Sequence, residues 1–155
     1  MITVRVQHAA FDAGLELAPL AALDGGAVAS FTGIAREDVN EMGGVTAIEL
    51  EHYPAMTAAA LEALVAQAFA RWELLGCVLI HRVGVISVGE AIVLVGTASP
   101  HRTAALEACA FLIDRLKTDA PFWKKEHRAG GAAWVEAKDS DAEAGERWQA
   151  SVPLR

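Results

Sequence analysis

The sequence predicts an α+β fold in which two main helices pack on a mostly antiparallel sheet. Strand-like apolar runs recur along the chain, and two longer segments rich in alanine and leucine have helical spacing. The connections at Gly84 and Gly89 are too short for a parallel crossover, which needs a dozen or more residues, so neighbouring strands are expected to run antiparallel. A length of 155 residues suits one domain, residues 1–155.

The first third of the chain alternates between strands and connections. Residues 2–7 alternate apolar and polar side chains, which predicts a half-buried strand, and residues 12–24 can include a short helix. A strand-like run follows at 27–34. The segment 37–44 is polar and ends in two glycines, so it is expected to be a mobile loop. Residues 45–53 alternate again and predict another strand.

Two helices are predicted from their capping residues and apolar spacing. The first is expected to begin near Thr57 as its N-cap and places apolar residues at helical intervals as far as Trp72. The second is expected to begin at Ser99 as N-cap with Pro100 in the first helical position. Pro121 ends it, because proline cannot continue a helix.

The remaining strands surround the second helix. Strands are predicted at 77–82, 85–88 and 91–98, before that helix. Two more are predicted after it, at 122–127 and 132–137. No internal repeat or low-complexity tract interrupts this order.

The composition excludes several classes of protein. Hydrophobic residues make up 54% and charged residues 21% of the chain, the opposite of a disordered sequence. Apolar runs such as 91–98 are far shorter than the roughly 20 residues of a membrane-spanning helix. The first residues lack the pattern of a secretory signal, and two cysteines do not form a disulfide scaffold, so we expect a cytoplasmic protein.

The charge distribution points to a local anion site. The net charge of −7 argues against general nucleic-acid binding. Residues 101–128 nevertheless carry six Lys or Arg against four Asp or Glu, in a chain that is otherwise acidic. A concentrated cationic stretch suits a small anionic ligand, although an ordinary solvated face explains the charge pattern equally well.

The start of the second predicted helix is the most specific part of that stretch. Backbone N–H groups at a helix start attract anions, and His101 and Arg102 add donors there. A cation in this first turn otherwise opposes the helix dipole, which favours an anion-binding role over side chains that simply point into solvent.

Three lysines follow towards the end of the cationic stretch. Lys117 lies in the last turn of the helix, where a lysine also simply complements the dipole. On a strand at 122–127, Lys124 and Glu126 share one face and Lys125 lies on the other. Lys124 beside Glu126 is either a surface ion pair or a site lysine held by its carboxylate.

Neither cysteine chemistry nor a metal is expected. Cys77 and Cys109 lie in apolar surroundings typical of small buried side chains. The histidines have no metal-ligand spacing, and neither a phosphate loop nor a Gly-x-Ser-x-Gly elbow occurs, so we expect no metal and no cofactor.

Six stretches together resemble the large, catalytic subunit of molybdopterin synthase, over about residues 26–138. They are SFTGIAR at 30–36, LEHYPAMT at 50–57, IHRVG at 80–84, ASPHR at 98–102, LKTDAPFWKKE at 116–126 and WVEA at 134–137. Each stretch alone is a weak signal, whereas all six in the family's order and spacing are specific.

The resemblance implies a function, a fold and a partner. The enzyme of this family converts cyclic pyranopterin monophosphate (precursor Z) into molybdopterin by installing two dithiolene sulfurs. Sulfur arrives as a thiocarboxylate on the C-terminal Gly-Gly of a small ubiquitin-like subunit. Two large subunits form a central dimer within a heterotetramer, and each pocket draws residues from both. The family fold is α/β-hammerhead-like, a form of α+β.

The resemblance also implies roles for particular residues. Lys117 and Lys124 match the catalytic lysines, and a set of further residues matches substrate-binding positions: Arg36, His101 and Arg102 at the substrate's phosphate and pterin, Lys125 and Glu126 along the pocket, and Phe31 near the path of the tail. Two positions depart from the family pattern. Ile113 replaces a methionine, and Lys138, also expected to bind substrate, replaces an arginine and so loses bidentate phosphate geometry.

Two other functions compete with this interpretation. One is a non-catalytic module that binds a ubiquitin-like tail or a phosphorylated metabolite, which the pair Lys117 and Lys124 disfavours. The other is a sulfurtransferase that carries persulfide on its own cysteine, which the apolar settings of Cys77 and Cys109 disfavour. We further predict that Arg36 and the His101–Arg102 pair converge on one phosphate-sized site from different subunits.

Overall fold

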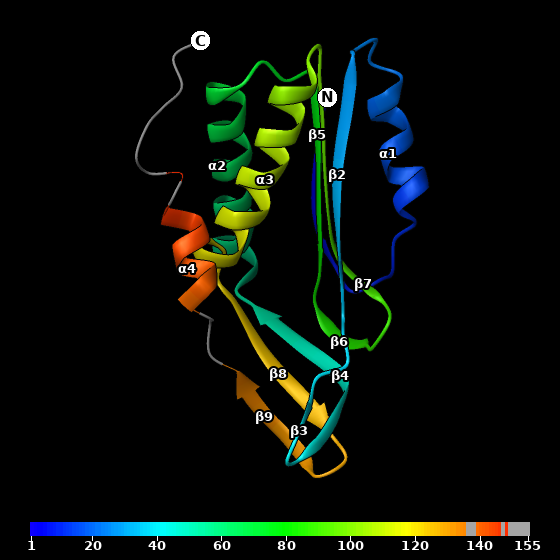
Figure 1. The fold of residues 1–155 in the computed structure, drawn as a ribbon, viewed down its shortest axis with the longest axis vertical. Coiled ribbons are helices and arrows are strands. Elements are labelled where there is room, and N and C mark those ends of the chain that lie inside the picture. The colour runs from blue at the N-terminus through cyan, green and yellow to red at the C-terminus, as the bar shows by residue number, and fades with distance from the viewer. Residues whose placement is uncertain (136–138, 147, 149–155) are drawn as a thin grey trace.

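The computed structural model shows two β-sheets and four helices among the residues that it describes (Figure 1). It describes residues 1–135, 139–146 and 148. In chain order the elements are β1 (Ile2–Gln7), α1 (Ala13–Ala21), β2 (Ala27–Ile34), β3 (Val39–Asn40), β4 (Gly43–His52), α2 (Pro54–Arg71), β5 (Gly76–Arg82), β6 (Gly84–Ser87), β7 (Ala91–Ser99), α3 (Arg102–Asp119), β8 (Phe122–Arg128), β9 (Gly131–Val135) and α4 (Asp139–Glu146).

The first sheet has four strands in the order β1-β5-β7-β2. Strands β1 and β5 are parallel, and the other two pairings are antiparallel. Helix α1 covers one face of this sheet, and α2 and α3 lie side by side on the other (Figure 1). Strand β2 forms one edge, with α3 packed against it.

The second sheet lies beyond one end of the first (Figure 1). Its path is β3-β4-β8-β9, and β6 pairs with β4. All of its pairings are antiparallel. The chain passes from the first sheet to the second between β2 and β3, between β5 and β6, and through α3 between β7 and β8. The first two crossings are short and lie at the junction of the two sheets.

The main core fills the space between the first sheet and helices α2 and α3. It includes fully buried side chains such as Leu61, Phe111 and Leu112, together with Leu79 and Val95 from the sheet. Burial of each large apolar side chain contributes about 1.5–3 kcal/mol, so this layer is the chief source of stability. Two smaller clusters lie under α1 and between β4 and β6.

The C-terminal part of the described chain packs back on α2 and α3. The Trp148 indole Nε1 donates a hydrogen bond to Asp114 Oδ2 over 2.8 Å. The Arg71 guanidinium lies 4.9 Å from the Phe111 ring centre and 5.7 Å from that of Trp148, at cation–π distance. Arg71 Nη1 also donates to the Trp148 carbonyl over 2.9 Å, which joins this segment to the main core.

The α+β class and all the predicted strands are confirmed, with bounds within a few residues. The strand predicted at 132–137 is described as Gly131–Val135, and residues 136–137 lie outside the described part. The expectation of one sheet is wrong, because the strands divide between two. The segment 37–44 is also more ordered than predicted, since Val39 and Asn40 pair with Gly44 and Gly43 as β3.

Both predicted helix starts are wrong by about a turn or less. Helix α2 begins at Pro54 with Tyr53 as N-cap, so Thr57 lies inside it. The fixed φ of proline suits the first helical position, which explains the earlier start. Helix α3 begins at Arg102 with His101 as N-cap. Ser99 is instead the last residue of β7, because its backbone pairs with Ala27 of β2, and its hydroxyl donates to the Glu73 carbonyl over 2.7 Å.

Among the described residues, no helix has the length and apolar character needed to cross a membrane.

Candidate functional site

Strand β8 carries three of the predicted site residues in a row. Lys124 lies opposite Leu50 of β4 and Val135 of β9, and Lys125 lies opposite Glu49 and Trp134. Because side chains alternate along a strand, Lys124 and Glu126 share one face and Lys125 the other, as predicted. All three are half-buried, so their charged ends are held near the protein surface.

The carboxylate of Glu126 pairs with Arg128. Arg128 Nη2 lies 3.5 Å from Glu126 Oε2, and Arg128 Nε donates to Asn40 Oδ1 over 3.2 Å. Within the described residues, the Lys124 side chain makes no hydrogen bond or ion pair. The predicted alternative of an ion pair between Lys124 and Glu126 is therefore absent from this part of the structure.

Lys125 contacts an aromatic surface on the opposite face of the same sheet. Its ammonium lies 4.6 Å from the centre of the Trp134 ring. Next to it is an open pocket of about 410 Å³ lined by Glu51, His52, Tyr53, Trp123 and Trp134. The Tyr53 and Trp123 rings meet edge to face at 4.8 Å. This pocket was not predicted, because its residues come from three strand ends that only the sheet register brings together.

Lys117 lies in the last turn of α3, at the end that leads into β8. Its side chain is exposed. Two residues to either side, Arg115 and Asp119 form an ion pair along the same helix. Only the short connection around Pro121 separates this turn from the strand of Lys124, so the two predicted catalytic lysines belong to the same end of the molecule.

His101 and Arg102 lie at the other end of α3. Both side chains are exposed, and the first turn contains no acidic residue. The backbone N–H of His101 donates to Ser99 Oγ over 3.2 Å. A rise of 1.5 Å per residue places Arg102 about 22 Å from Lys117 along the helix axis. The two ends of α3 therefore cannot share one small ligand within a single chain.

Arg36 lies at the same end of the first sheet as the lysines. It follows β2, is exposed, and has its Nη2 3.6 Å from Asp38 Oδ2. The register pairs Ala27 with Ser99 and Ile34 with Ala91, so β2 runs from the His101 end towards Arg36. Arg36 and the His101–Arg102 pair are thus separated in one chain by about the length of β2, roughly 23 Å.

Phe31 lies near the middle of β2, opposite Val95, with 38% of its surface exposed. Lys138, also a predicted substrate-binding residue, lies outside the described residues.

The two thiols are buried and protonated. Cys77 is 0% and Cys109 6% exposed, and both are free. Burial, and to a lesser degree the neighbouring Cys109, raises the pKa of Cys77 to about 12. Burial raises the pKa of Cys109 to about 11. Since the thiolate is the reactive form of cysteine, neither residue suits the persulfide alternative. In the described ranges, no cluster of three or more His, Cys, Asp or Glu could hold a metal ion.

The fold and these groups define an α+β protein with exposed cations at both ends of one helix, and the free backbone N–H groups at the helix start favour an anionic ligand there. Its two thiols take no part in this surface, because both cysteines are enclosed in the core.

Comparison with known proteins gives the family. The profile of the MoaE protein family matches residues 6–119. A molybdopterin synthase catalytic subunit from Mesorhizobium japonicum is 51% identical over 153 residues, covering 96% of this chain and 94% of the relative. The chain belongs to the MoaE protein family.

Solved structures share the fold. The molybdopterin biosynthesis MoaE protein from Burkholderia ambifaria superposes with a TM-score of 0.80 at 43% identity, covering 97% of this chain and 100% of that one. A protein–protein complex of subunits 1 and 2 of molybdopterin-converting factor from Helicobacter pylori contains a chain with a TM-score of 0.72 at 23% identity, covering 87% of this chain and 91% of that one.

Proposed function

We propose that this chain is the catalytic subunit of a molybdopterin synthase. It transfers sulfur from the C-terminal thiocarboxylate of a small ubiquitin-like subunit to cyclic pyranopterin monophosphate, which forms the dithiolene of molybdopterin. The observation that carries the proposal is the 51% identity to a named catalytic subunit over 96% of the chain. The end-to-end coverage matters, because it includes every residue range that bears the cations described above.

Lys117 and Lys124 are the proposed catalytic residues. The substrate's phosphate and the incoming thiocarboxylate are both anions, so local positive charge is needed to bring them together. Replacement of an oxygen by sulfur also requires proton transfers, which a positioned lysine can mediate. The absence of a carboxylate partner for Lys124 in the described residues supports this role, because its ammonium remains available to the substrate. Lys125 and Glu126 are also proposed to bind substrate, from opposite faces of β8.

Arg36, His101 and Arg102 are proposed to bind the substrate's phosphate and pterin, with Lys138 as a further cation. The arrangement needs two copies of the chain, because Arg36 lies at the opposite end of β2 from the other two. We therefore propose that each pocket takes Arg36 from one subunit and His101 and Arg102 from its partner.

The edge strand β2 supports this two-fold arrangement. Its sequence, AVASFTGI, contains no charged residue, although exposed edges are usually protected by charge. Val28, Phe31 and Ile34 are all partly exposed, at 43%, 38% and 49%. If two copies of β2 pair antiparallel about a two-fold axis near Phe31, the Arg36 end of one strand lies beside the His101 end of the other.

The small subunit is the proposed partner, in a heterotetramer with a central dimer of this chain. The Helicobacter pylori structure of the same fold supports such an assembly, since it is a complex of two different subunits. We also propose that residues 1–155 act as a single domain in the cytoplasm. The free thiols of Cys77 and Cys109 suit a reducing compartment.

The test is reconstitution. This protein is mixed with precursor Z and a small subunit that carries the C-terminal thiocarboxylate, and molybdopterin is measured by the fluorescence of its oxidised derivative. The same small subunit with an ordinary carboxylate is the control. Molybdopterin only with the thiocarboxylate supports the proposal. Binding of both partners without product favours a non-catalytic binding module instead.

A further inference from the structure

Arg82 is a buried cation at the junction of the two sheets. It is the last residue of β5 and is 7% exposed. Directly after it, the chain crosses to β6 in the second sheet. The other short crossing, between β2 and β3, carries Arg36. A charged side chain is costly to bury unless its donors are paired. The hydrogen-bond partners of the Arg82 guanidinium therefore identify the segments that it holds together.

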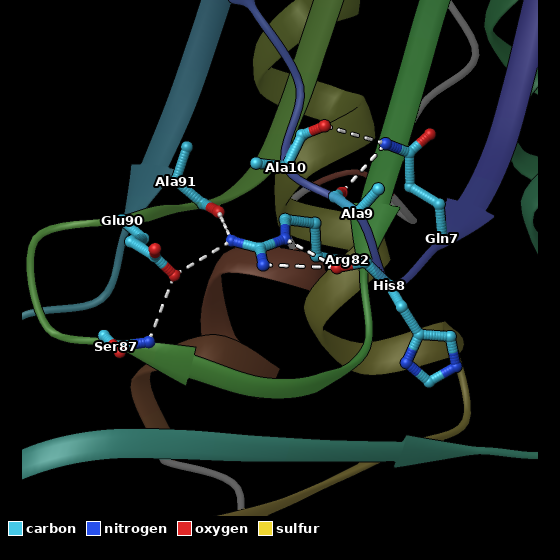
Figure 2. A network of polar contacts seen from close by, with 8 residues as sticks. All are labelled: Gln7, His8, Ala9, Ala10, Arg82, Ser87, Glu90 and Ala91. Carbon is cyan, nitrogen blue, oxygen red and sulfur yellow. Dashed lines mark hydrogen bonds and ion pairs between the residues drawn. The ribbon is translucent and has the colours of Figure 1, made fainter.

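The guanidinium joins its own strand, β5, to two other segments: the residues that follow β1 and the turn between β6 and β7 (Figure 2). Nε and Nη2 each donate to the His8 carbonyl over 3.2 Å. Nη1 donates to Glu90 Oε2 over 3.3 Å and to the Ala91 carbonyl over 3.2 Å. Glu90 Oε2 also accepts the Ser87 N–H over 3.2 Å. Arg82 therefore fixes the turn between β6 and β7 against the segment that follows β1.

The same turn makes two backbone hydrogen bonds to Ala35, the residue before Arg36. The Ala35 N–H donates to the Glu90 carbonyl over 2.9 Å, and the Gly89 N–H donates to the Ala35 carbonyl over 2.7 Å. The regular pairing of β2 with β7 is interrupted between Gly33 and Ile34, so these two bonds hold the chain beyond the irregularity. Ala35 is buried at 2% exposure, and Arg36 is the first exposed cation after it.

We propose that Arg82 is a positioning residue for Arg36: through Glu90 and the turn at 87–90 it sets the backbone from which Arg36 reaches the substrate's phosphate. This inference rests on the phosphate-binding role proposed for Arg36 above. Arg82 does not bind the substrate itself, because it is buried and its three nitrogen atoms already donate to protein oxygens.

A lysine cannot replace Arg82 in this position. The planar guanidinium reaches the His8 carbonyl on one side and Glu90 and Ala91 on the other, whereas an ammonium is a single point of charge. In Arg82→Lys, the turn at 87–90 is expected to lose its fixed place, and Arg36 with it. The loss is expected in substrate binding more than in the chemical step, because the bonds of this network go to His8, Ser87, Glu90 and Ala91, away from Lys124 on β8.

The experiment combines hydrogen exchange with a double-mutant cycle in the reconstituted enzyme. Arg82→Lys is expected to raise the exchange rate of the Ala35 amide about tenfold. It is expected to raise KM for the pyranopterin about fivefold with kcat within about twofold of wild type. In the double variant with Arg36→Ala, KM equals that of Arg36→Ala alone, because Arg82 acts through Arg36. Arg5→Gln is the matched control. It breaks an ion pair between β1 and Glu16 of α1, and it leaves the Ala35 exchange rate, KM and kcat unchanged.

Two results overturn the proposal: an unchanged exchange rate at Ala35, or effects of Arg82→Lys and Arg36→Ala on KM that simply multiply. If Arg82→Lys does not fold, Glu90→Ala tests the same link from the solvent side, since the Glu90 side chain is 50% exposed. Failure of the proposed phosphate role is seen separately, as an Arg36→Ala variant with unchanged KM. The exchange rate of Ala35 then still decides whether Arg82 fixes this backbone.

Discussion

Replacing Cys77 and Cys109 together with alanine separates the proposed mechanism from one that uses a protein persulfide. Both thiols lie in the main core between the sheet and helices α2 and α3, at 0% and 6% exposure. Trimming one small buried group costs about 1 kcal/mol of unfolding free energy, so the double variant is expected to lose about 2 kcal/mol. For a chain of this length, that corresponds to a fall in Tm of about 4–8 °C.

The same variant has a predicted signature at alkaline pH. Burial raises the pKa values to about 12 for Cys77 and about 11 for Cys109, from 9.0 in the unfolded chain. Above pH 9 the unfolded chain therefore releases these protons first, so their stabilisation is complete below pH 9 and is lost as the pH rises towards 11–12. The alanine variant lacks both groups, and its stability is expected to fall less steeply over this range.

The assay pairs urea unfolding at pH 7.5 and pH 10 with molybdopterin formation at pH 7.5. The proposed mechanism predicts a less stable variant with sulfur transfer intact, because the sulfur arrives on the partner. The single variants Cys77→Ala and Cys109→Ala show whether the two costs add, which neighbouring core residues often do not. A folded double variant that forms no molybdopterin refutes the reasoning and favours the persulfide route.

Three further predictions concern the site and its surroundings. Lys117→Ala is expected to lower molybdopterin formation at least about 100-fold with small-subunit binding unchanged, and near-normal turnover would contradict its catalytic role. Arg102→Ala is expected to weaken precursor Z binding about tenfold, measured by calorimetry, and equal weakening of both partners would count against a phosphate site. Burial lowers the pKa of His81 to about 4 from 6.5, so its contribution to stability is complete above pH 6.5 and is lost as the pH falls towards 4. The free energy of unfolding of His81→Gln, measured in urea, is therefore expected to fall less steeply than that of the wild type between pH 6.5 and pH 4. An equally steep fall would refute this.

The sequence predicts the strands well because alternation is a local signal. Residues 2–7 and 27–34 alternate or run apolar within one segment, and the structure places β1 and β2 there. The predicted helix starts differ from the structure for two reasons. Pro54 begins α2 before the expected cap at Thr57. Ser99 pairs with Ala27 of β2 as part of β7, and no local pattern reveals that pairing.

Features that depend on distant pairing escaped prediction. The division into two sheets follows from contacts such as β4 with β8, about 75 residues apart in the chain. The Arg82 network joins His8 to Glu90 and Ala91 for the same reason. The sequence did place Lys124, Lys125 and Glu126 on one strand, because neighbours along a strand stay together. It gave no distance between Arg36 and Arg102, which only the register of β2 with β7 determines.

The two-subunit pocket is tested most directly by mixing two variants that each have little activity at a precursor Z concentration below the wild-type KM, Arg36→Ala and Arg102→Ala, under conditions where the subunits exchange. After random exchange, half of the dimers contain one subunit of each variant. In each of these mixed dimers, one of the two pockets combines an intact Arg36 from one subunit with an intact Arg102 from the other. The proposed arrangement predicts recovery of about a quarter of the wild-type molybdopterin synthase activity. If both arginines serve a pocket within the same subunit, no intact pocket forms, and a mixture as inactive as its components would contradict the proposal.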